Sequence, residues 1–206
     1  MVQLIVEGDG DVVAAPALLR RLRDGACAFE LQIGRPIRQP RSHLIREEYL
    51  SRAIEIARRQ PGCSSILILF DGDDDCPKEL APRVQDWAIR ASGGIPCVVV
   101  MAHREYEAWF LASVESLRGC CGIRNDAQPP DNPEAPRGAK EALEELMAPG
   151  GSYHETADQV SLTARFDMET AYRRSRSFRR MTSAFGALLQ AEGAAAETWP
   201  PAAWRE

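Results

Sequence analysis

A dense group of carboxylates ends one apolar stretch of the chain and has the chemistry to bind a divalent cation. Residues 66–70 are uninterrupted Ile, Leu and Phe, and the acids that follow are Asp71, Asp73, Asp74 and Asp75. Carboxylates crowded together repel one another and would protonate or splay apart unless a cation neutralises them. Mg²⁺ prefers oxygen ligands of this kind. We therefore expect a metal site here; the alternative is a solvated acidic loop after a core strand.

A second acidic turn, EGDGD at residues 7–11, follows the apolar residues 2–6. Glu7 and Asp71 would then both stand at the carboxyl ends of buried strands, and in open α/β sheets ligands bind beyond those ends. This turn does not fit a phosphate-binding loop, because it lacks the Lys and Ser/Thr of a Walker motif and its acids would repel phosphate. Carboxylate chemistry is the better interpretation.

A third group of acids follows the apolar residues 95–101. Glu105 and Glu107 fall in the expected first turn of a helix, where the helix dipole favours acids, and this alone would account for them. Glu105 would also emerge on the same edge of the sheet as Glu7 and Asp71. It is therefore a candidate for a direct role, ahead of Glu107.

Basic side chains that could contact a polyanion lie in two stretches. Residues 34–41 form a Pro-broken loop with three arginines, and residues 173–180, RRSRSFRR, are the densest basic run. Contacts to phosphates from these stretches would position a nucleic acid near the acidic edge. Ordinary solvated charge is the alternative for both. The candidates for nucleic-acid contact are Arg38, Arg41, Arg173, Arg176 and Arg179.

The apolar pattern predicts strands alternating with helices. Continuous apolar runs of strand length, separated by helical patterns, are typical of a parallel sheet covered on both faces. We expect an α/β fold with a Rossmann-like, mainly parallel central sheet flanked by helices, and a C-terminal helical extension. The predicted strands are 2–6, 27–33, 66–70 and 95–101, and the principal predicted helices are 12–23, 44–60, 77–91, 137–147 and 177–191.

The domain organisation follows from composition along the chain. Residues 1–118 form the expected α/β core, and residues 119–136, rich in Gly, Pro, Asn and Asp, form a long loop. Long loops of this kind in compact domains are usually functional or mobile. Residues 137–192 are expected to be a helical extension packed on the core, and residues 193–206 a loose tail.

Composition gives weaker guidance on function. The 206 residues include 25 basic and 30 acidic side chains, a net charge of −5 that does not favour nucleic-acid binding, although arginines can still cluster locally. No apolar stretch reaches membrane-spanning length and no signal peptide opens the sequence, so we expect a cytoplasmic protein that does not bind membranes. Six cysteines without a Cys-x-x-Cys pair are expected to be free thiols.

The order of these motifs resembles a known family. VEG at residues 6–8, FDGD at 70–73 and REYEAWFLA at 104–112 are similar to the pattern of the bacterial Toprim-like domain-of-unknown-function 4276 family. Toprim folds occur in primases, topoisomerases and related nucleases. Later positions also fit the pattern, so the resemblance spans nearly the whole chain. These positions are Lys140, Tyr153, residues 156–159 and Ser177-Phe178, of which Lys140 is a further candidate for nucleic-acid contact.

The resemblance implies a metal-dependent, nuclease-like protein that hydrolyses phosphodiester bonds with Mg²⁺ or Mn²⁺. In the Toprim pattern Glu7 is a general acid/base or a metal ligand, and Asp71 and Asp73 hold the metal ion. Asp75 or Glu105 would complete a second site. The implied catalytic set is thus Glu7, Asp71, Asp73 and Glu105, and the implied metal ligands are Glu7, Asp71, Asp73 and Asp75.

The resemblance also indicates partners. Relatives often lie beside an ATPase of the ABC or OLD-like type in phage-defence operons, so an ATPase, a homodimer and nucleic acid (DNA before RNA) are the candidate partners. Topoisomerase activity is not expected, because no separate domain supplies a covalently linking Tyr. Two other functions stay open. One is a small-molecule phosphohydrolase with Asp71 as nucleophile, and the other is a non-catalytic regulatory subunit of an ATPase system.

Overall fold

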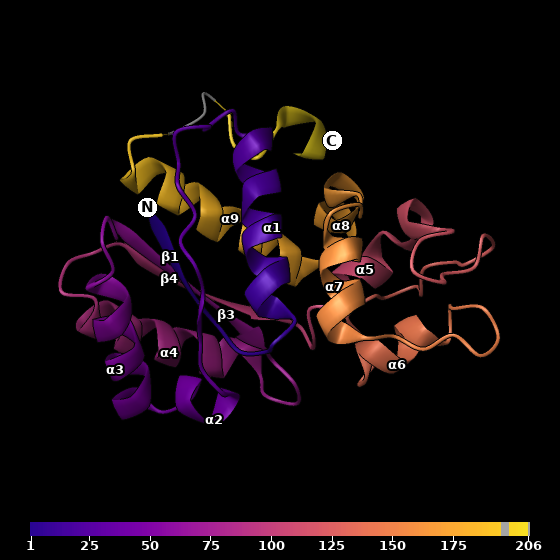
Figure 1. Cartoon of the computed structure of the whole chain (residues 1–206), viewed down its shortest axis with the longest axis horizontal. Coiled ribbons are helices and arrows are strands. Elements are labelled where there is room, and N and C mark those ends of the chain that lie inside the picture. The colour runs from indigo at the N-terminus through magenta and orange to yellow at the C-terminus, as the bar shows by residue number, and fades with distance from the viewer. Residues whose placement is uncertain (195–197, 206) are drawn as a thin grey trace.

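A computed structural model describes residues 1–194 and 198–205 of the chain, with a four-stranded sheet at its centre (Figure 1). All strand pairs are parallel and the strand order is β2-β1-β3-β4. The strands are β1 (Val2–Val6), β2 (Ile37–Arg38), β3 (Ser65–Asp71) and β4 (Cys97–Ala102). The predicted α/β fold with a Rossmann-like parallel sheet is confirmed.

Helices cover both faces of this sheet (Figure 1). One face packs on α3 (Glu47–Arg58) and α4 (Pro77–Ala91), and the other packs on α1 (Asp11–Gly25) and α9 (Arg176–Ala191). The remaining helical segments are α2 (Arg41–Leu44), α5 (Ala108–Ala112), α6 (Ala139–Glu144), α7 (Glu155–Thr163), α8 (Met168–Arg174) and the short 3₁₀ helices η1 (Val114–Leu117) and η2 (Ala202–Arg205).

The apolar run of β3 is uninterrupted because both of its faces are buried. Successive side chains of a strand point to opposite faces of the sheet. Ile66 and Ile68 accordingly pack with the α3–α4 layer, whereas Leu67 and Leu69 pack with the α1–α9 layer. This arrangement carries the chain straight from the core to its carboxyl edge at Asp71, where the acidic turn begins.

The second strand is not where the sequence predicted it. Within 27–33 only Ile33 reaches β1, as an isolated bridge to Val2, and the paired strand is Ile37–Arg38. Cys27 has a φ of 54°, in the left-handed region, so an extended strand cannot start there. The expected strand 27–33 is therefore wrong, and β2 occupies part of the predicted loop 34–41.

The C-terminal helices share a hydrophobic core with the sheet. α7 packs along α1, α8 packs on α5, and α9 packs on β4. A chain of aromatic contacts continues this core, with Tyr106, Trp109 and Phe110 of the β4–α5 region meeting Phe166 and Phe178. The helices of residues 137–192 thus deliver side chains directly to the carboxyl edge of the sheet.

The end of the chain also packs on these helices where it is described. The Trp204 ring lies 5.7 Å from that of Tyr172 in α8 and 5.9 Å from that of Trp199, between centroids. Residues 195–197 and 206 of the expected tail lie outside the described residues. Across the described ranges 1–194 and 198–205, no helix has the length and apolarity to cross a membrane.

Candidate active site

Two carboxylates from different strands meet at the carboxyl edge of the sheet. Glu7 follows β1 and Asp71 ends β3, and the Asp71 N–H donates to Glu7 Oε2 at 3.2 Å. The Asp71 side chain is fixed in turn, because its Oδ1 accepts the Tyr106 N–H at 2.9 Å. The structure therefore brings together the two acids that the strand-end rule singles out.

A buried hydrogen-bond network surrounds this pair. Asp11, at the start of α1, accepts the Gly8 N–H at 2.9 Å and the Gln159 side-chain amide at 3.2 Å. The same Gln159 amide lies 3.5 Å from Glu107 Oε1, which also accepts the Tyr153 hydroxyl at 2.7 Å. α1, α5 and α7 thus each contribute one polar side chain to a common centre.

This centre holds more acceptors than donors. Glu107 is 0% exposed and Gln159 is 2% exposed, yet Glu107 Oε2 and Gln159 Oε1 have no hydrogen-bond partner among the described residues. A buried acceptor without a partner loses the free energy of its hydration. The donor set fits a hard cation, which takes carboxylate and amide oxygens. No three His, Cys, Asp or Glu side chains in the described ranges form a ready-made metal cage, so the fit rests on donor chemistry.

The same crowding of acids raises their pKa values. Burial raises the pKa of Asp11 to about 6 and that of Glu107 to about 7. The pKa of Asp71 is well above its ordinary range because of burial and, next, the charge of Glu107. Burial also raises the pKa of Glu7. Each shift reports that the pocket disfavours further negative charge, which a bound cation would relieve.

Lys140 of α6 places a positive charge among these acids. Its Nζ donates to Glu155 Oε2 at 3.0 Å, and its backbone N–H donates to Glu105 Oε2 at 2.9 Å. Burial lowers the pKa of Lys140, but the charges of Glu107, Asp71 and Glu155 more than offset this, and the pKa is raised. Lys140 therefore stays protonated and neutralises part of the acidic centre.

A cleft of about 400 Å³ between the β1–α1 turn, α6 and α7 is lined by Glu7, Asp11, Asp71, Glu155 and Lys140, and Glu107 lies buried outside its lining. α7 approaches the turn closely, because a Cβ added at Gly10 would lie 2.7 Å from Glu155 Cγ and 3.1 Å from the Glu155 carbonyl oxygen. The two glycines in EGDGD thus allow the backbone to pass beneath α7. This close passage positions Glu155 and Gln159 over the acidic turn.

The acidic turn after β3 divides into separate groups. Asp73 and Asp75 are both paired with Arg41, the former at 3.0 Å from its Nε, and Arg41 also donates to the carbonyl oxygens of Asp71 and Gly72. Asp73 adopts a left-handed φ of 46°, and its side chain lies beside this guanidinium. Arg41 therefore holds the turn in place through both its side-chain and its backbone oxygens.

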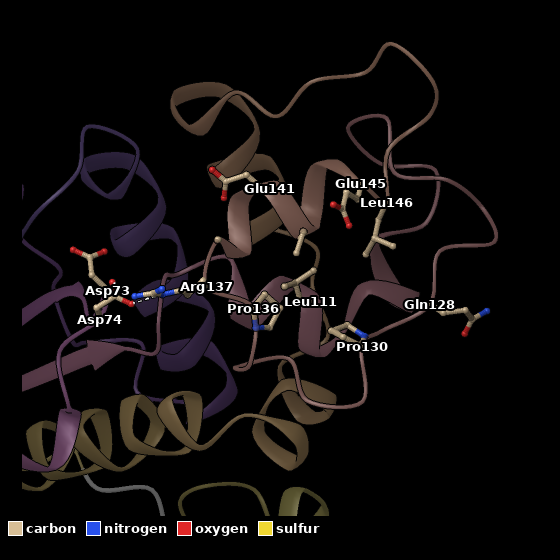
Figure 2. A pocket seen from close by; sticks show the side chains of 12 residues that line it. Asp73, Asp74, Leu111, Gln128, Pro130, Pro136, Arg137, Glu141, Glu145 and Leu146 are labelled. Atoms are coloured by element: carbon tan, nitrogen blue, oxygen red, sulfur yellow. Dashed lines mark hydrogen bonds and ion pairs between the residues drawn. The ribbon is translucent and has the colours of Figure 1, made fainter.

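Asp74 faces a different cavity. Its carboxylate pairs with Arg104 at 2.7 Å. It also pairs with Arg137, in the segment before α6, at 2.8 Å (Figure 2). The cavity measures about 880 Å³ and is lined further by Leu111, Pro136 and other residues of α5, α6 and the loop 119–136. Asp74 thus ties the segment before α6 to the turn after β3 and does not line the cleft.

Some of the residues predicted to contact nucleic acid line the cleft, and the others lie away from it. Arg38, Arg41 and Lys140 line the cleft, and Arg38 pairs with Asp9 at 2.8 Å. The basic run 173–180 does not line it. Arg173 pairs with Glu169 at 2.6 Å, Arg179 donates to backbone carbonyls, and Arg176 lines a groove beside β4.

Arg179 is expected to contribute to stability rather than to nucleic-acid binding. Its guanidinium donates to the carbonyl oxygens of Tyr172 and Arg173, both at 2.8 Å, at the end of α8. Arg179→Ala should lower the free energy of unfolding by about 1–2 kcal/mol, because charge-assisted bonds to the last helix carbonyls are lost. Urea denaturation measures this, with Arg180→Ala as the exposed control. An unchanged stability together with weaker nucleic-acid binding would contradict the expectation.

Several residues of the centre were not predicted as site residues. The sequence pattern gives Asp11 and Glu155 no role, and Gln159 falls only in a stretch that matches the family pattern. The order of Glu105 and Glu107 is also reversed, since Glu107 faces the buried network whereas Glu105 binds the Lys140 backbone. The four-residue spacing of Glu155 and Gln159, which puts both on one helix face, was the available signal.

Comparison with known proteins adds one finding. A family model described as a domain of unknown function (DUF4276) matches residues 6–185, which include every carboxylate of the cleft. No curated protein and no solved structure matches the chain.

Proposed function

The chain belongs to the DUF4276 family, and from this premise and the chemistry of its cleft we propose that it is a metal-dependent hydrolase of phosphodiester bonds in nucleic acid. The observation that carries the proposal is the buried, acceptor-rich centre around Glu7, Asp71 and Glu107, whose pKa values are all raised. The resemblance to Toprim nucleases supports the proposed reaction class, and the role that we propose for it is in phage defence or DNA processing.

Glu7, Asp71 and Glu107 are the side chains that would hold the ion, and Asp11 and Gln159 belong to the same hydrogen-bond network. When bound, Mg²⁺ or Mn²⁺ would stabilise charge on the scissile phosphate and lower the pKa of an attacking water. The protein prepares these ligands in advance. The Tyr106 N–H orients Asp71 and the Tyr153 hydroxyl orients Glu107, so neither carboxylate must reorganise when an ion arrives.

The other cleft residues would bind substrate and move the proton. Lys140, held protonated by the acids around it, can pair with a non-bridging phosphate oxygen. Arg38 lies exposed on the rim and can contact a flanking phosphate. The Glu7 carboxylate lines the cleft beside Asp71 and can accept a proton from water as a general base.

A regulatory role is the second candidate. The cleft is lined by five acids and three basic side chains, and two further acids of the turn are held by Arg41. Such a surface repels a polyanion until a cation binds. A non-catalytic subunit that reports metal or substrate binding to a partner ATPase would have the same residues, and the resemblance suggests such a partner.

Cleavage assays on the full chain test the proposal. Purified protein with Mn²⁺ or Mg²⁺ is incubated with labelled single- and double-stranded DNA and RNA, beside Glu7→Gln and the exposed control Glu30→Gln. We expect cleavage by wild type and Glu30→Gln, and a loss of about 10²-fold or more in Glu7→Gln, because a positioned general base is removed.

Either of two results would count against the proposal. Equal cleavage by Glu7→Gln and wild type would show that the cleft is not the active site. A folded wild-type protein that binds Mn²⁺ but cleaves none of the four substrates would favour the regulatory role.

A further inference from the structure

β4 is an edge strand whose outer side borders a groove. The groove measures about 730 Å³ and runs along β4 between α4 on one face of the sheet and the first turns of α9 on the other. Its floor includes Val99 and Met101 of the strand, and Ala81 and Pro82 of α4 contribute apolar surface. An uncovered strand edge offers a row of backbone donors and acceptors to another chain.

One side chain already uses this edge as a neighbouring strand would. The Gln85 amide donates to the Cys97 carbonyl oxygen at 2.7 Å and accepts the Val99 N–H at 2.8 Å. A parallel strand makes the same pair of bonds, to a carbonyl and to the N–H two residues later. Gln85 therefore takes the place of one residue of a neighbouring strand. Its two bonds show that the Cys97 carbonyl and the Val99 N–H point away from β3.

The edge continues beyond Gln85 without a partner. Gly72 N–H bonds to the Ala102 carbonyl, so the main-chain groups of even-numbered residues of β4 face β3 and those of odd-numbered residues face outward. The Met101 main chain thus faces the groove, and no described residue outside the sheet bonds to it. His103 follows the strand and lines the groove, and its buried Nδ1 has no partner among the described residues. One pairing position of the strand, at Met101, is therefore unused, and an unpartnered imidazole nitrogen lies just beyond it.

The walls of the groove are basic. Lys78, Arg176 and Arg180 line it, and none of them makes an ion pair within the described ranges. The chain itself places one carboxylate at the end of the groove, where Glu134 accepts the Ser177 N–H at 2.7 Å. Asp86 is the other acid of the lining, so three basic side chains and His103 face two acids.

We propose that this groove binds an extended, acidic segment of a partner protein, which adds to β4 as a fifth strand beside Met101 and His103. Backbone pairing supplies the affinity of such additions and side-chain pockets supply their specificity. A second copy of the chain fits less well, because it would bring two basic walls together. The apolar floor and the free strand edge favour a peptide over nucleic acid. The site lies apart from the carboxylate cleft and does not depend on the proposed hydrolysis.

Selection from a phage-displayed library of random octapeptides on the full chain tests this inference. We expect enriched sequences that combine acidic with β-branched residues. A synthetic copy of an enriched peptide should bind about tenfold or more weakly to the Arg176→Glu/Arg180→Glu protein, measured by fluorescence anisotropy, because two attractive charges become repulsive. Arg20→Glu, on the exposed side of α1, is the matched control and should bind as wild type does.

Backbone pairing is tested by N-methylating alternate amides of that peptide, which removes the donors from one of its edges. One of the two methylation patterns should lower the affinity about tenfold or more and the other should not. The proposal is overturned if no sequence is enriched, if both patterns bind equally well, or if charge reversal has no effect. It is also overturned if the groove captures a single-stranded oligonucleotide in place of the peptide.

Discussion

Asp71→Asn is expected to abolish metal-dependent hydrolysis while the fold stays intact. The asparagine keeps an oxygen to accept the Tyr106 N–H, which is the bond that holds residue 71 in place. It removes the negative charge at the centre of the cleft, and with it the strongest attraction for a divalent ion. A metal ion supplies several kcal/mol of transition-state stabilisation, so activity should fall by about 10³-fold.

Two measurements separate this effect from misfolding. Calorimetric titration with Mn²⁺ should show the loss of binding in Asp71→Asn, and thermal unfolding without metal should show equal or higher stability. Asp131→Asn changes an exposed acid of the loop 119–136 and should behave as wild type does. If Asp71→Asn binds Mn²⁺ with wild-type affinity, Asp71 is not a ligand and the proposed site is wrong.

The second large effect concerns pH. The metal-free protein should lose stability as the pH rises from about 4 to 8. Asp11 and Glu107 have folded-state pKa values of about 6 and about 7, above those of exposed carboxyls, so the folded state binds more protons than the unfolded state in this range. Stability falls with pH wherever the folded state holds the extra protons. Glu107 is fully buried, so its share is about 2–3 kcal/mol.

Glu107→Gln should reduce this slope, leave the share of Asp11, and raise stability at pH 8. The glutamine carbonyl still accepts the Tyr153 hydroxyl, and its amide offers a donor near the unpartnered Gln159 Oε1. Urea unfolding in EDTA at pH 5, 6, 7 and 8 measures both effects, with the exposed Glu141→Gln as control. A wild-type stability that is constant or rises across this range would show that the acids are not strained in the folded state.

The parts of the fold that the sequence predicts are those with a purely local signal. Residues 77–91 were predicted as a helix and form α4 with the same bounds, because a proline begins the helix and Gly93-Gly94 follow it. β3 is predicted for the same reason, because its apolar run ends at a group of acids. β2 was missed because it is short and half-exposed, and its pairing depends on β1 rather than on its own pattern.

Only the site residues that directly follow or end a strand were predictable from the sequence. Glu7 and Asp71 follow from the rule that parallel strands share a carboxyl edge. Gln159 reaches Asp11 across 148 positions of sequence, and no local pattern reports such a contact. The ion pair between Asp73 and Arg41 is likewise a long-range contact. The sequence therefore could not show that Asp71 lines the cleft whereas Asp73 pairs with Arg41.

The position of α9 has a consequence for how the protein is made. This helix covers one face of β4, although the sheet it covers is complete by residue 102. During synthesis, at about 5–20 residues per second, the ribosome must add residues 103–191 before that face can be closed. Apolar side chains such as Val100, fully buried in the finished protein, would stay open to water and to chaperones for several seconds. A chain that stops before Arg176 therefore carries all its strands and remains an incomplete, aggregation-prone domain.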